Sequence, residues 1–487
     1  MLQYIQDHWW KLLLVLNYLL VIIFSILIVL KNSNPVKTLS YIFALATLPF
    51  LGLLVYYFVG QDYRKNKIFE KKYFLDDAKL KNWRKRFKLD REEREDFEEE
   101  FGEGLAKIHK LLRYNERSVL TFDNEVDILV NGEVKFKRLR EDLRKAKDHI
   151  HMEYFVFLDD ELGSELIDIL VEKAAEGVHV RLLYDDVGSK FSAATKKKMN
   201  QSGIAHFPFM PVHLPKFASK LNYRDHRKIV VIDGSVGYVG GININKKYDN
   251  SYKNPRYWRD THLRIEGPAV GSLQASFLLS WDFCNNEEEE LINEFFPEHK
   301  PDCNDPVGVQ IAASGPDTDW ANIMEAMFTA INTARDYIYI TTPYLIPNNA
   351  MLTALSTAGR SGVDVRIIIP YESDSWAAQY ATDSYIEELL SSRVKIFRYT
   401  KGFIHSKTMV VDDSFSSIGT ANLDYRSFSI NFEVNALLYS QNKAKEMKEL
   451  FEKDLEDCDV VDLDRWLERG IRRKLQESFN RLWAPLL

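Results

Sequence analysis

Two short stretches decide the fold of this chain: HRKIVVID at 226–233 and HSKTMVVD at 405–412. Each combines a histidine, a lysine two residues later and an aspartate five residues after the lysine, within one apolar run. A glycine lies seven residues beyond each aspartate and an asparagine ten residues beyond it. One such motif would be a weak signal, but two with matching downstream residues indicate an internal repeat. The downstream pairs are Gly240 with Asn243 and Gly419 with Asn422.

The repeat extends well upstream of the two motifs. Each copy contains an apolar, strand-like run, then a helix, then a second apolar strand, and in the first copy Leu166, Ile167 and Leu170 fall on one helical face. Strands that alternate with helices predict an α/β sandwich with a largely buried sheet in each copy. The matching segments are AKDHIHMEYFVFLDD at 146–160 with ARDYIYITTPYLIPN at 334–348, and GVHVRLLY at 177–184 with GVDVRIII at 362–369.

The spacing inside each motif orients its side chains. Side chains alternate between the two faces of a strand, so a histidine and the lysine two residues later project to the same side and the aspartate to the opposite side. We therefore expect each histidine to share a pocket with its lysine, and each aspartate to be a structural partner of that site. The candidate catalytic set is His226, Lys228, Asp233, His405, Lys407 and Asp412.

A single anion site follows if the two copies pack about a pseudo-twofold axis. Both histidine–lysine pairs would then converge, together with the amides of Asn243 and Asn422. Two ammonium groups and amide donors around a small centre suit one phosphodiester, and we expect the two asparagines to support phosphate binding. The alternative is that these are ordinary sheet residues, which the repetition disfavours.

Two histidines that face one phosphate suggest a division of labour. A neutral imidazole is a nucleophile at phosphorus, and a protonated one is a general acid toward the departing alkoxide. A phosphohistidine formed in this way would be resolved by a second alcohol. This chemistry calls for no metal or other cofactor. The three cysteines, Cys284, Cys303 and Cys458, lie far apart and in no zinc-type spacing.

A further pair of acidic residues comes from extending the alignment of the two copies. WRDTH at 258–262 aligns with NFEVN at 431–435, which places Asp260 opposite Glu433. A carboxylate aimed at a catalytic imidazole fixes its tautomer and stabilises the imidazolium. We assign this supporting role to both residues, with a plain salt bridge or a surface position as the alternative.

The N-terminal region differs in composition from the rest. The run from Leu12 to Leu30 is apolar apart from three residues and, at about 1.5 Å per residue, spans roughly 28 Å, close to the hydrocarbon thickness of a bilayer. A second apolar run, Leu39 to Val59, follows the turn KNSNPVKT, which predicts a two-helix transmembrane hairpin. A cleaved signal peptide is the alternative, but the first run is too long and no small-residue cleavage site follows it.

Basic residues predict the orientation of this hairpin. They crowd the exit of the second span and are fewer in the turn, so both ends of the hairpin and the catalytic domains are expected on the cytoplasmic side of the cell membrane. An acidic run, Glu92 to Glu103, follows; we interpret it as part of a charged, helical connector, with a solvated spacer as the alternative. The basic residues after the second span are Arg64, Lys65, Lys67, Lys71 and Lys72. Those in the turn are Lys31 and Lys37, and Lys11 precedes the first span.

Length and charge limit the remaining possibilities. A chain of 487 residues is long enough for two or three domains with separate cores. Its net charge of −7 argues against a nucleic-acid partner, which needs a basic groove. We divide the chain into a transmembrane hairpin at 1–62, a juxtamembrane connector at 63–115, a first α/β domain at 116–300 and a second at 301–487 that ends in an amphipathic helix.

The paired motifs resemble the phospholipase D superfamily, and further stretches are similar to its bacterial cardiolipin synthases. The resemblance covers nearly the whole chain and includes every candidate catalytic position. Beyond the motifs it is carried by NPVKTLSYIFALATLPFLGLLVYYFVGQDYRKNKIF at 34–69, NYRDHRKIVVIDG at 222–234, GGININ at 240–245, WRDTH at 258–262, IHSKTMVVDD at 404–413, GTANLDYRSF at 419–428 and SFNRLWAPLL at 478–487.

The resemblance implies a reaction. One phosphatidylglycerol would donate its phosphatidyl group to a histidine, glycerol would leave, and a second phosphatidylglycerol would accept the group to give cardiolipin. It implies His226 as nucleophile and His405 as general acid, although the symmetry of the repeat allows the reverse. The partners would be these two lipids in the bilayer; the oligomeric state is left open. The alternatives are a phospholipase D-type phosphodiesterase, another phosphatidyltransferase, or a membrane scaffold with a degenerate site, which the intact motifs disfavour.

Two further regions are candidates for lipid contact. The segment Phe207 to Phe217 combines aromatic residues and prolines with His213 and Lys216, as either an interfacial loop or a buried loop beside the site. Near the C-terminus, apolar residues repeat every three or four positions among basic ones. Such a helix either lies on an anionic membrane or, more commonly, packs onto the catalytic body. Its apolar residues are Leu467, Ile471, Leu475, Phe479, Leu482 and Leu486, with Arg469, Arg472, Arg473, Lys474 and Arg481 nearby.

Overall fold

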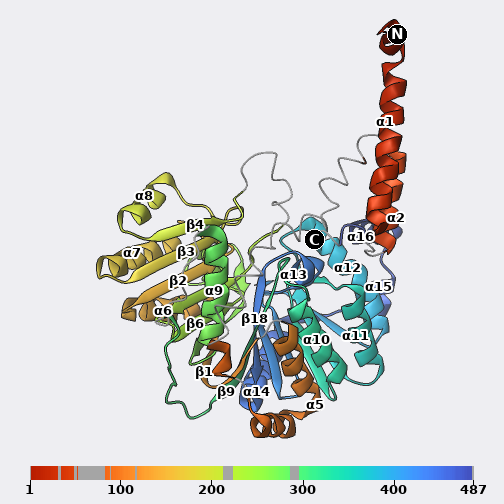
Figure 1. The fold of residues 1–487 in the computed structure, drawn as a ribbon. Coiled ribbons are helices and arrows are strands. Elements are labelled where there is room, and N and C mark those ends of the chain that lie inside the picture. Colours follow the sequence, from red (N-terminus) through yellow and green to blue (C-terminus); the bar gives the residue numbers. More distant parts are fainter. Residues whose placement is uncertain are drawn as a thin grey trace. The chain divides into compact units, whose positions relative to one another are not determined.

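The computed structural model describes residues 2–30, 35–48, 52, 83–87, 89–115, 118–211, 223–285 and 295–484. These residues belong to two compact units. One unit contains the N-terminal helices α1 and α2, and the other, the catalytic body, contains all described residues from 83 onward (Figure 1).

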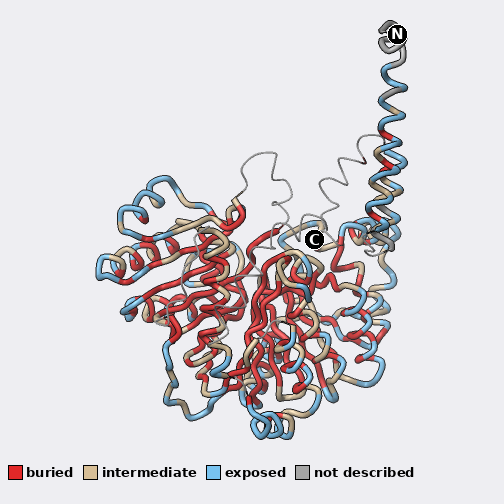
Figure 2. The backbone as a smooth tube through the Cα atoms, in the orientation of Figure 1, coloured by how far each residue is buried: buried red, intermediate tan, exposed pale blue. Residues whose placement is uncertain are grey.

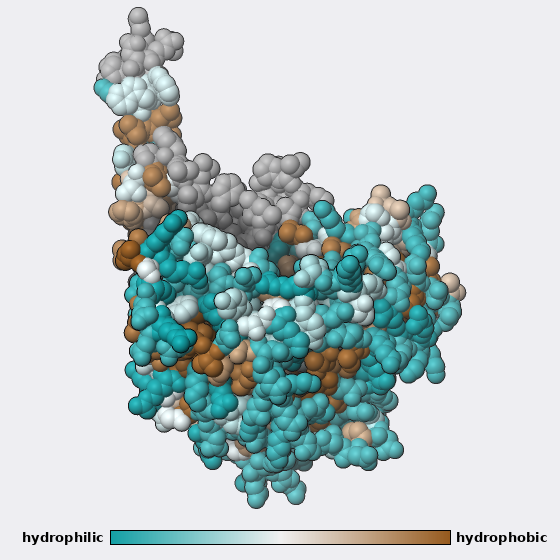
Figure 3. All heavy atoms as spheres, turned by 180° about the vertical axis from the view of Figure 1, so that it is seen from behind, coloured by the Kyte–Doolittle hydropathy of each residue, from teal (hydrophilic) through white to brown (hydrophobic). Residues whose placement is uncertain are grey.

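The N-terminal unit is a pair of helices, α1 (Leu2–Leu30) and α2 (Pro35–Thr47). Val21 and Ile28 of α1 pack against Leu45 of α2, while many other apolar side chains of α1 are exposed (Figure 2). Brown, apolar surface is visible along this unit in Figure 3. Within α1, Trp9–Leu30 is a stretch of 22 residues that is long and apolar enough to cross a membrane. So much exposed apolar surface is costly in water and favourable in lipid, which indicates membrane association.

Two membrane spans were expected, and one is found among the described residues. Nearly half of the second apolar run, at 49–51 and 53–59, lies outside the described residues, as does the first half of the connecting turn at 31–34. The packing of α2 on α1 is compatible with a hairpin but does not test a second span. The basic residues on which the orientation rests, from Arg64 to Lys72, also lie outside the described residues.

The catalytic body is built on one 15-stranded sheet with the order β19-β13-β12-β10-β15-β16-β18-β9-β1-β8-β6-β5-β2-β3-β4. The first half supplies β1 (Leu120–Val130), β2 (His149–Tyr154), β3 (His179–Asp185), β4 (Ala205–Phe209), β5 (Lys228–Ile232), β6 (Val236–Gly240) and β8 (Thr261–Glu266). The second supplies β9 (Val307–Ser314), β10 (Tyr337–Thr341), β12 (Asp364–Pro370), β13 (Lys395–Tyr399), β15 (Thr408–Val411), β16 (Phe415–Gly419), β18 (Glu433–Tyr439) and β19 (Cys458–Val460).

The strand order shows how the two copies of the repeat are related. Reading outward from the centre, β1-β8-β6-β5-β2-β3-β4 matches β9-β18-β16-β15-β10-β12-β13 position by position. The two central strands pair antiparallel, with Leu120 opposite Gln310, as a twofold axis between them requires. The predicted pair of similar α/β halves about a pseudo-twofold is therefore confirmed. The halves share one continuous sheet and form a single compact unit.

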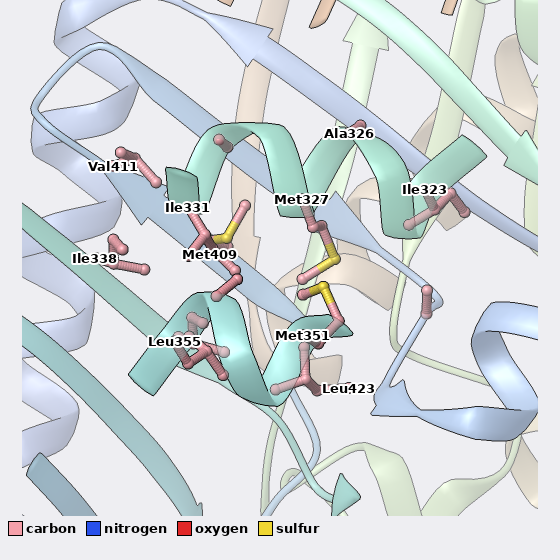
Figure 4. Close-up of a cluster of buried hydrophobic side chains, with 14 of the residues drawn as sticks. Ile323, Ala326, Met327, Ile331, Ile338, Met351, Leu355, Met409, Val411 and Leu423 are labelled. Atoms are coloured by element: carbon pink, nitrogen blue, oxygen red, sulfur yellow. The ribbon is translucent and has the colours of Figure 1, made fainter. Parts of the chain in front are cut away.

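Helices cover both faces of this sheet (Figure 1). In the second half, α10 and α11 pack side by side on one face, where Met327, Met351 and Met409 meet among aliphatic side chains (Figure 4).

The expected helix between β2 and β3 is α7, and Gly177 with φ +95° follows its end. The helices of the first half are α6 (Asn131–Lys145), α7 (Glu161–Ala175), α8 (Ala193–Gln201) and α9 (Val270–Asn285), with the 3-10 turn η2 (Lys246–Tyr248); those of the second are α10 (Asn322–Thr333), α11 (Asn349–Arg360), α12 (Trp376–Ser391), α13 (Tyr425–Ser429), α14 (Gln441–Leu455), α15 (Leu463–Leu467) and α16 (Ile471–Arg481).

The acidic segment after residue 90 has more structure than a connector or spacer. Segment α5 (Arg91–Asn115) is helical as expected, with a kink at Gly102 (φ +81°), and its apolar residues are buried in the core of the second half, beside α10. The apolar spacing of Leu105, Ile108 and Leu112 was not considered in the sequence, because a run of carboxylates precedes it. These carboxylates occupy the exposed side and the first turns of the helix.

Candidate active site

Each histidine–lysine pair lies at the start of an equivalent strand. His226 and Lys228 lie at the start of β5, and His405 and Lys407 just before β15. The Nζ atoms of Lys228 and Lys407 donate to the backbone oxygens of His226 and His405, each at 2.6 Å, and Lys407 Nζ also lies 2.8 Å from His405 Nε2. Each lysine thus turns back toward its own histidine, as the alternation of side chains along a strand requires.

Each imidazole is held by a carboxylate from the opposite half of the molecule. His226 Nδ1 lies 2.9 Å from both carboxylate oxygens of Glu433, and His405 Nδ1 lies 2.8 Å from Oδ2 of Asp260. Both carboxylates are fully buried. The aligned acidic pair therefore meets the histidines in the supporting arrangement expected from the sequence, but crossed between the halves. Nε2 is the ring nitrogen that no carboxylate binds, and in His405 it contacts Lys407 Nζ.

The backbone also joins the halves at the histidines. The N–H of His226 donates to the oxygen of Phe432 at 2.9 Å, and the N–H of His405 donates to the oxygen of Arg259 at 2.7 Å. The short strands β7 (Tyr257–Arg259) and β14 (Gly402–Ile404) pair across the same boundary. The two motifs are therefore brought together at one boundary between the halves, as the shared-site hypothesis requires.

A close approach of backbone and carboxylate fixes Asp260. A Cβ atom added to Gly241 would lie only 2.1 Å from Asp260 Oδ1, so a glycine is needed at this position. On the other side, Thr420 Oγ1 donates to Glu433 Oε2 at 2.5 Å and Asn431 Nδ2 donates to Glu433 Oε1 at 3.2 Å. Thr420 was not singled out from the sequence, although it directly follows the matched Gly419.

The two motif aspartates lie away from the imidazoles. Asp233 accepts hydrogen bonds from the backbone N–H groups of residues 147–149, and Asp412 accepts from those of residues 335–337. Each therefore ties the end of a motif strand to the start of the neighbouring strand, β2 or β10. Both have φ of +51°, a conformation that aspartate tolerates better than most residues. Their contacts are those of structural partners.

The two asparagines brace the loops that carry the site. Asn243 Oδ1 accepts from the backbone N–H of Val156 at 3.1 Å, and Asn422 Nδ2 donates to Asp424 Oδ2 at 3.0 Å. Both side chains are buried. Asn422 Oδ1 is buried without a hydrogen-bond partner among the described residues.

Burial sets the charge state of the site. Burial, with the neighbouring Lys228 and Lys407 ammonium groups, lowers the pKa of His226 well below its usual value. Burial and Lys407 lower the pKa of His405 to about 4, and Asp260 acts in the opposite direction. Burial also lowers the pKa of Lys228 to about 7 and that of Lys407 to about 8, while it raises the pKa of Glu433 to about 7. The free site therefore holds neutral imidazoles beside lysines that are close to losing their protons.

A buried cluster of charged residues adjoins His226. It differs in composition from the surroundings of His405, where Arg259 pairs with Asp454 at 2.7 Å. Arg224 Nη1 lies 3.3 Å from Asp185 Oδ1, and Arg227 Nη1 lies 3.9 Å from Glu153 Oε1. The backbone N–H of Asp225 donates to Asp185 Oδ2, while burial and Glu153 raise the pKa of the Asp225 side chain. These residues were missed from the sequence. The available signal was the RDHR stretch at 224–227, where the second copy has FIHS at 403–406.

Comparison with known families identifies both halves of the body and the N-terminal region. A family model described as cardiolipin synthase, PLD-like domain, matches residues 139–254 and 327–455, which include both histidine–lysine pairs. A second model, described as phospholipase D-nuclease N-terminal, matches residues 19–61.

Curated relatives match almost the full chain. Cardiolipin synthase 2 of Bacillus anthracis is 41% identical over 464 residues, covering 94% of this chain and 88% of its own. A cardiolipin synthase of Geobacillus sp. (strain WCH70) is 40% identical over 99% of this chain and 96% of its own, and the major cardiolipin synthase ClsA of Bacillus subtilis (strain 168) is 38% identical over 98% and 99%.

Solved structures share the fold. Phosphatidylserine synthase of Haemophilus influenzae Rd KW20 superposes with a TM-score of 0.57 at 15% identity, covering 74% of this chain and 95% of its own. Polyphosphate kinase of Porphyromonas gingivalis superposes with a TM-score of 0.50 at 13% identity, over 74% of this chain and 52% of its own. At these identities the similarity concerns the fold alone.

The structural role assigned to the motif aspartates predicts the effect of removing them. Asp412→Ala and Asp233→Ala should each lower the free energy of unfolding by about 2 kcal/mol, because the released N–H groups lose a charged acceptor and are only partly reached by water. Denaturant titration of the detergent-solubilised protein, followed by circular dichroism, measures this. Asp319→Ala, at an exposed turn position, is the matched control. If all three variants unfold at the same denaturant concentration, the strand ends do not depend on these carboxylates.

Proposed function

This chain belongs to the cardiolipin synthase family of phosphatidyltransferases with paired PLD-like domains, and we propose that it joins two phosphatidylglycerol molecules through a phosphohistidine intermediate, releasing glycerol. The observation that carries the proposal is the crossed pair of imidazole–carboxylate contacts, His226 with Glu433 and His405 with Asp260. Each contact holds Nδ1 and leaves Nε2 for a phosphorus atom or a leaving oxygen.

The first half-reaction forms the intermediate. Nε2 of His226 attacks phosphorus of the first phosphatidylglycerol, a P–N bond forms and the bond from phosphorus to the headgroup glycerol oxygen breaks. His405 donates a proton from Nε2 to that oxygen, so glycerol leaves as a neutral alcohol. The phosphatidyl group remains on His226.

The second half-reaction releases cardiolipin. A headgroup hydroxyl of the second phosphatidylglycerol gives its proton to His405 and attacks phosphorus, the P–N bond breaks, and His226 returns to its neutral state. One phosphodiester replaces another, so no external energy source is required. Lys228 and Lys407, with Asn243 and Asn422, would hold the anionic phosphodiester throughout.

The assignment of His226 as nucleophile is supported by its environment. A nucleophile must be neutral and a general acid must gain a proton. His226 is partnered by Glu433, whose pKa burial raises to about 7, so this carboxylate stabilises an imidazolium weakly. Asp260 raises the pKa of His405 against the effect of burial, which favours protonation of His405 once an anionic substrate is bound.

Phospholipid hydrolysis is the competing function, because a phosphohistidine accepts water as readily as an alcohol. Purified protein with phosphatidylglycerol in vesicles should yield cardiolipin and glycerol in equal amounts, with little phosphatidic acid. His226→Ala and His405→Ala should each reduce cardiolipin formation by at least about a thousandfold, while the protein stays in the membrane fraction. Phosphatidic acid as the main product, or substantial activity in either variant, would contradict the proposal.

The two histidine roles predict different behaviour with an activated substrate. Phosphatidyl-p-nitrophenol carries a leaving group that needs no proton. His405→Ala should therefore release a burst of about one nitrophenolate per enzyme and stop, with the phosphatidyl group on His226 detectable by mass spectrometry of the peptides. His226→Ala should give no burst. The opposite pattern would assign the nucleophile to His405.

The lowered lysine pKa values predict the pH dependence of kcat/KM. Lys228 and Lys407, with pKa values of about 7 and about 8, lose their charge as pH rises through this range, so kcat/KM for an anionic lipid should fall above pH of about 7 and more steeply above about 8. In kcat the fall should lie at higher pH, because bound phosphodiester stabilises both ammonium groups.

Lys407→Arg provides the sharpest check of this profile. The guanidinium does not titrate in this range, so the steeper fall above pH of about 8 should disappear while the Lys228 step near pH of about 7 remains, even where the maximal rate is lower. Lys197→Arg, at an exposed site on α8, is the control and should leave the profile unchanged. An alkaline fall that is the same in wild type and Lys407→Arg would exclude Lys407 as its cause.

A further inference from the structure

Helix α16 is attached to the catalytic body by its polar face. Glu477 and Asn480 are each only 2% exposed, whereas Ile471, Leu475 and Phe479 are 74%, 62% and 56% exposed. An amphipathic helix on a globular protein ordinarily shows the reverse, with its apolar stripe toward the core. The sequence analysis expected this helix either to pack onto the body or to lie on a membrane, and the structure shows that packing leaves the apolar face free.

The polar attachment is built from charged pairs. Arg473 Nη2 lies 2.5 Å from Oδ2 of Asp383, a fully buried residue of α12. Arg469 binds Glu477 at 3.0 Å and Glu387 of α12 at 2.8 Å. Because these contacts use buried or half-buried groups, they fix which side of the helix faces the body. The outward direction of the apolar side is therefore set by the fold.

We infer that the outward face of α16, formed by Ile471, Leu475, Phe479, Leu482 and Trp483, lies in the interface of an anionic lipid bilayer. All five side chains are about half exposed or more. An apolar stripe between basic flanks, with a tryptophan at one end, is typical of helices that lie in the headgroup region.

The basic residues beside the apolar face of α16 favour an anionic membrane over a second copy of the chain. In the described part of the chain, Arg472 makes no ion pair and Lys474 is hydrogen-bonded only to the backbone oxygen of Leu467, so both retain charge available for anionic headgroups. A second copy of the chain would bring the same positive charges together. A helix of 11 residues also offers a patch of only a few hundred Å², below the roughly 800 Å² per partner of a stable protein interface.

The helix is connected to the active site through few contacts. It packs on α12, where Thr382 Oγ1 accepts a hydrogen bond from the N–H of Leu345. Leu345 begins the two-residue strand β11 (Leu345–Ile346), which pairs with β17 (Leu423–Asp424), directly after Asn422. Seating α16 in the headgroup region would therefore hold this edge of the site close to its lipid substrate, a consequence that rests on the proposed function. The membrane contact itself does not rest on it.

Depth-dependent fluorescence tests the contact independently of catalysis. In full-length protein with Cys284, Cys303 and Cys458 replaced by serine, Leu475→Cys carries an NBD probe, and Tyr114→Cys on α5, 84% exposed, is the matched control. In vesicles of equal parts phosphatidylglycerol and phosphatidylcholine, brominated acyl chains should quench the probe at 475 at least about threefold more than the probe at 114. Equal quenching at both sites would overturn the inference, as would a disulfide between two copies at 475 without lipid quenching.

Turnover on two forms of the substrate provides the second readout. The double variant Leu475→Glu with Phe479→Glu should lose about tenfold in rate on phosphatidylglycerol in vesicles, since it removes apolar insertion and adds repulsion. It should stay within about twofold of wild type on short-chain phosphatidylglycerol below its micellar concentration, and Tyr114→Glu should match wild type on both. Equal loss on both substrates would contradict the inference. If wild type makes no cardiolipin at all, the proposed function fails while the quenching result still stands.

Discussion

The exchange of carboxylates between the two halves is the interaction on which the rest of the structure depends. Glu433 and Asp260 are fully buried, and each points at an imidazole that the other half supplies. Without the other half each buried carboxylate would lose its imidazole, which is unfavourable, so each half requires the other to complete its site. The continuous sheet follows from this requirement, because the antiparallel pairing of β1 with β9 holds the halves in the one register that aligns both contacts.

The two halves of the site are similar but not identical, and they differ in the residues around the two histidines. Both histidines have a lysine and a carboxylate, but their charged neighbours differ. Arg224, Asp225 and Arg227 adjoin His226, whereas Arg259, paired with Asp454, adjoins His405. The corresponding residues beside His405 are Phe403, Ile404 and Ser406. A gene duplication produces equal sites, whereas a nucleophile and a general acid need different proton affinities. The different charged neighbours of the two imidazoles provide such a difference.

The sequence predicts the parts of this site that depend on local spacing. Alternation of side chains along a strand was enough to place each histidine beside its lysine and to place Asp233 and Asp412 away from the imidazoles. The sequence could not show that each carboxylate contacts the histidine of the opposite half. Asp260 aligns with Glu433 whichever histidine each of them contacts. The charged cluster at 224–227 was missed because the repeat directs attention to residues that occur twice. For α16 the periodicity gave an apolar face correctly, but the direction of that face depends on tertiary contacts such as Arg473 with Asp383. The buried face of α5 was not predicted, because the acidic run dominates that segment.

Burial of two lysines makes the electrostatics of the free site unfavourable. Burial takes the lysine pKa from 10.5 to about 7 for Lys228 and to about 8 for Lys407. At about 1.4 kcal/mol for each tenfold change in proton affinity, this corresponds to several kcal/mol of destabilisation of the charged site, a large fraction of the stability of an ordinary domain. Under the proposed function, a phosphodiester between the two ammonium groups would supply the missing negative charge and recover part of this energy. Because a transition state for transfer spreads more charge onto the same oxygens, the recovery would be greatest there, and the cost of burying both lysines would become a source of catalysis.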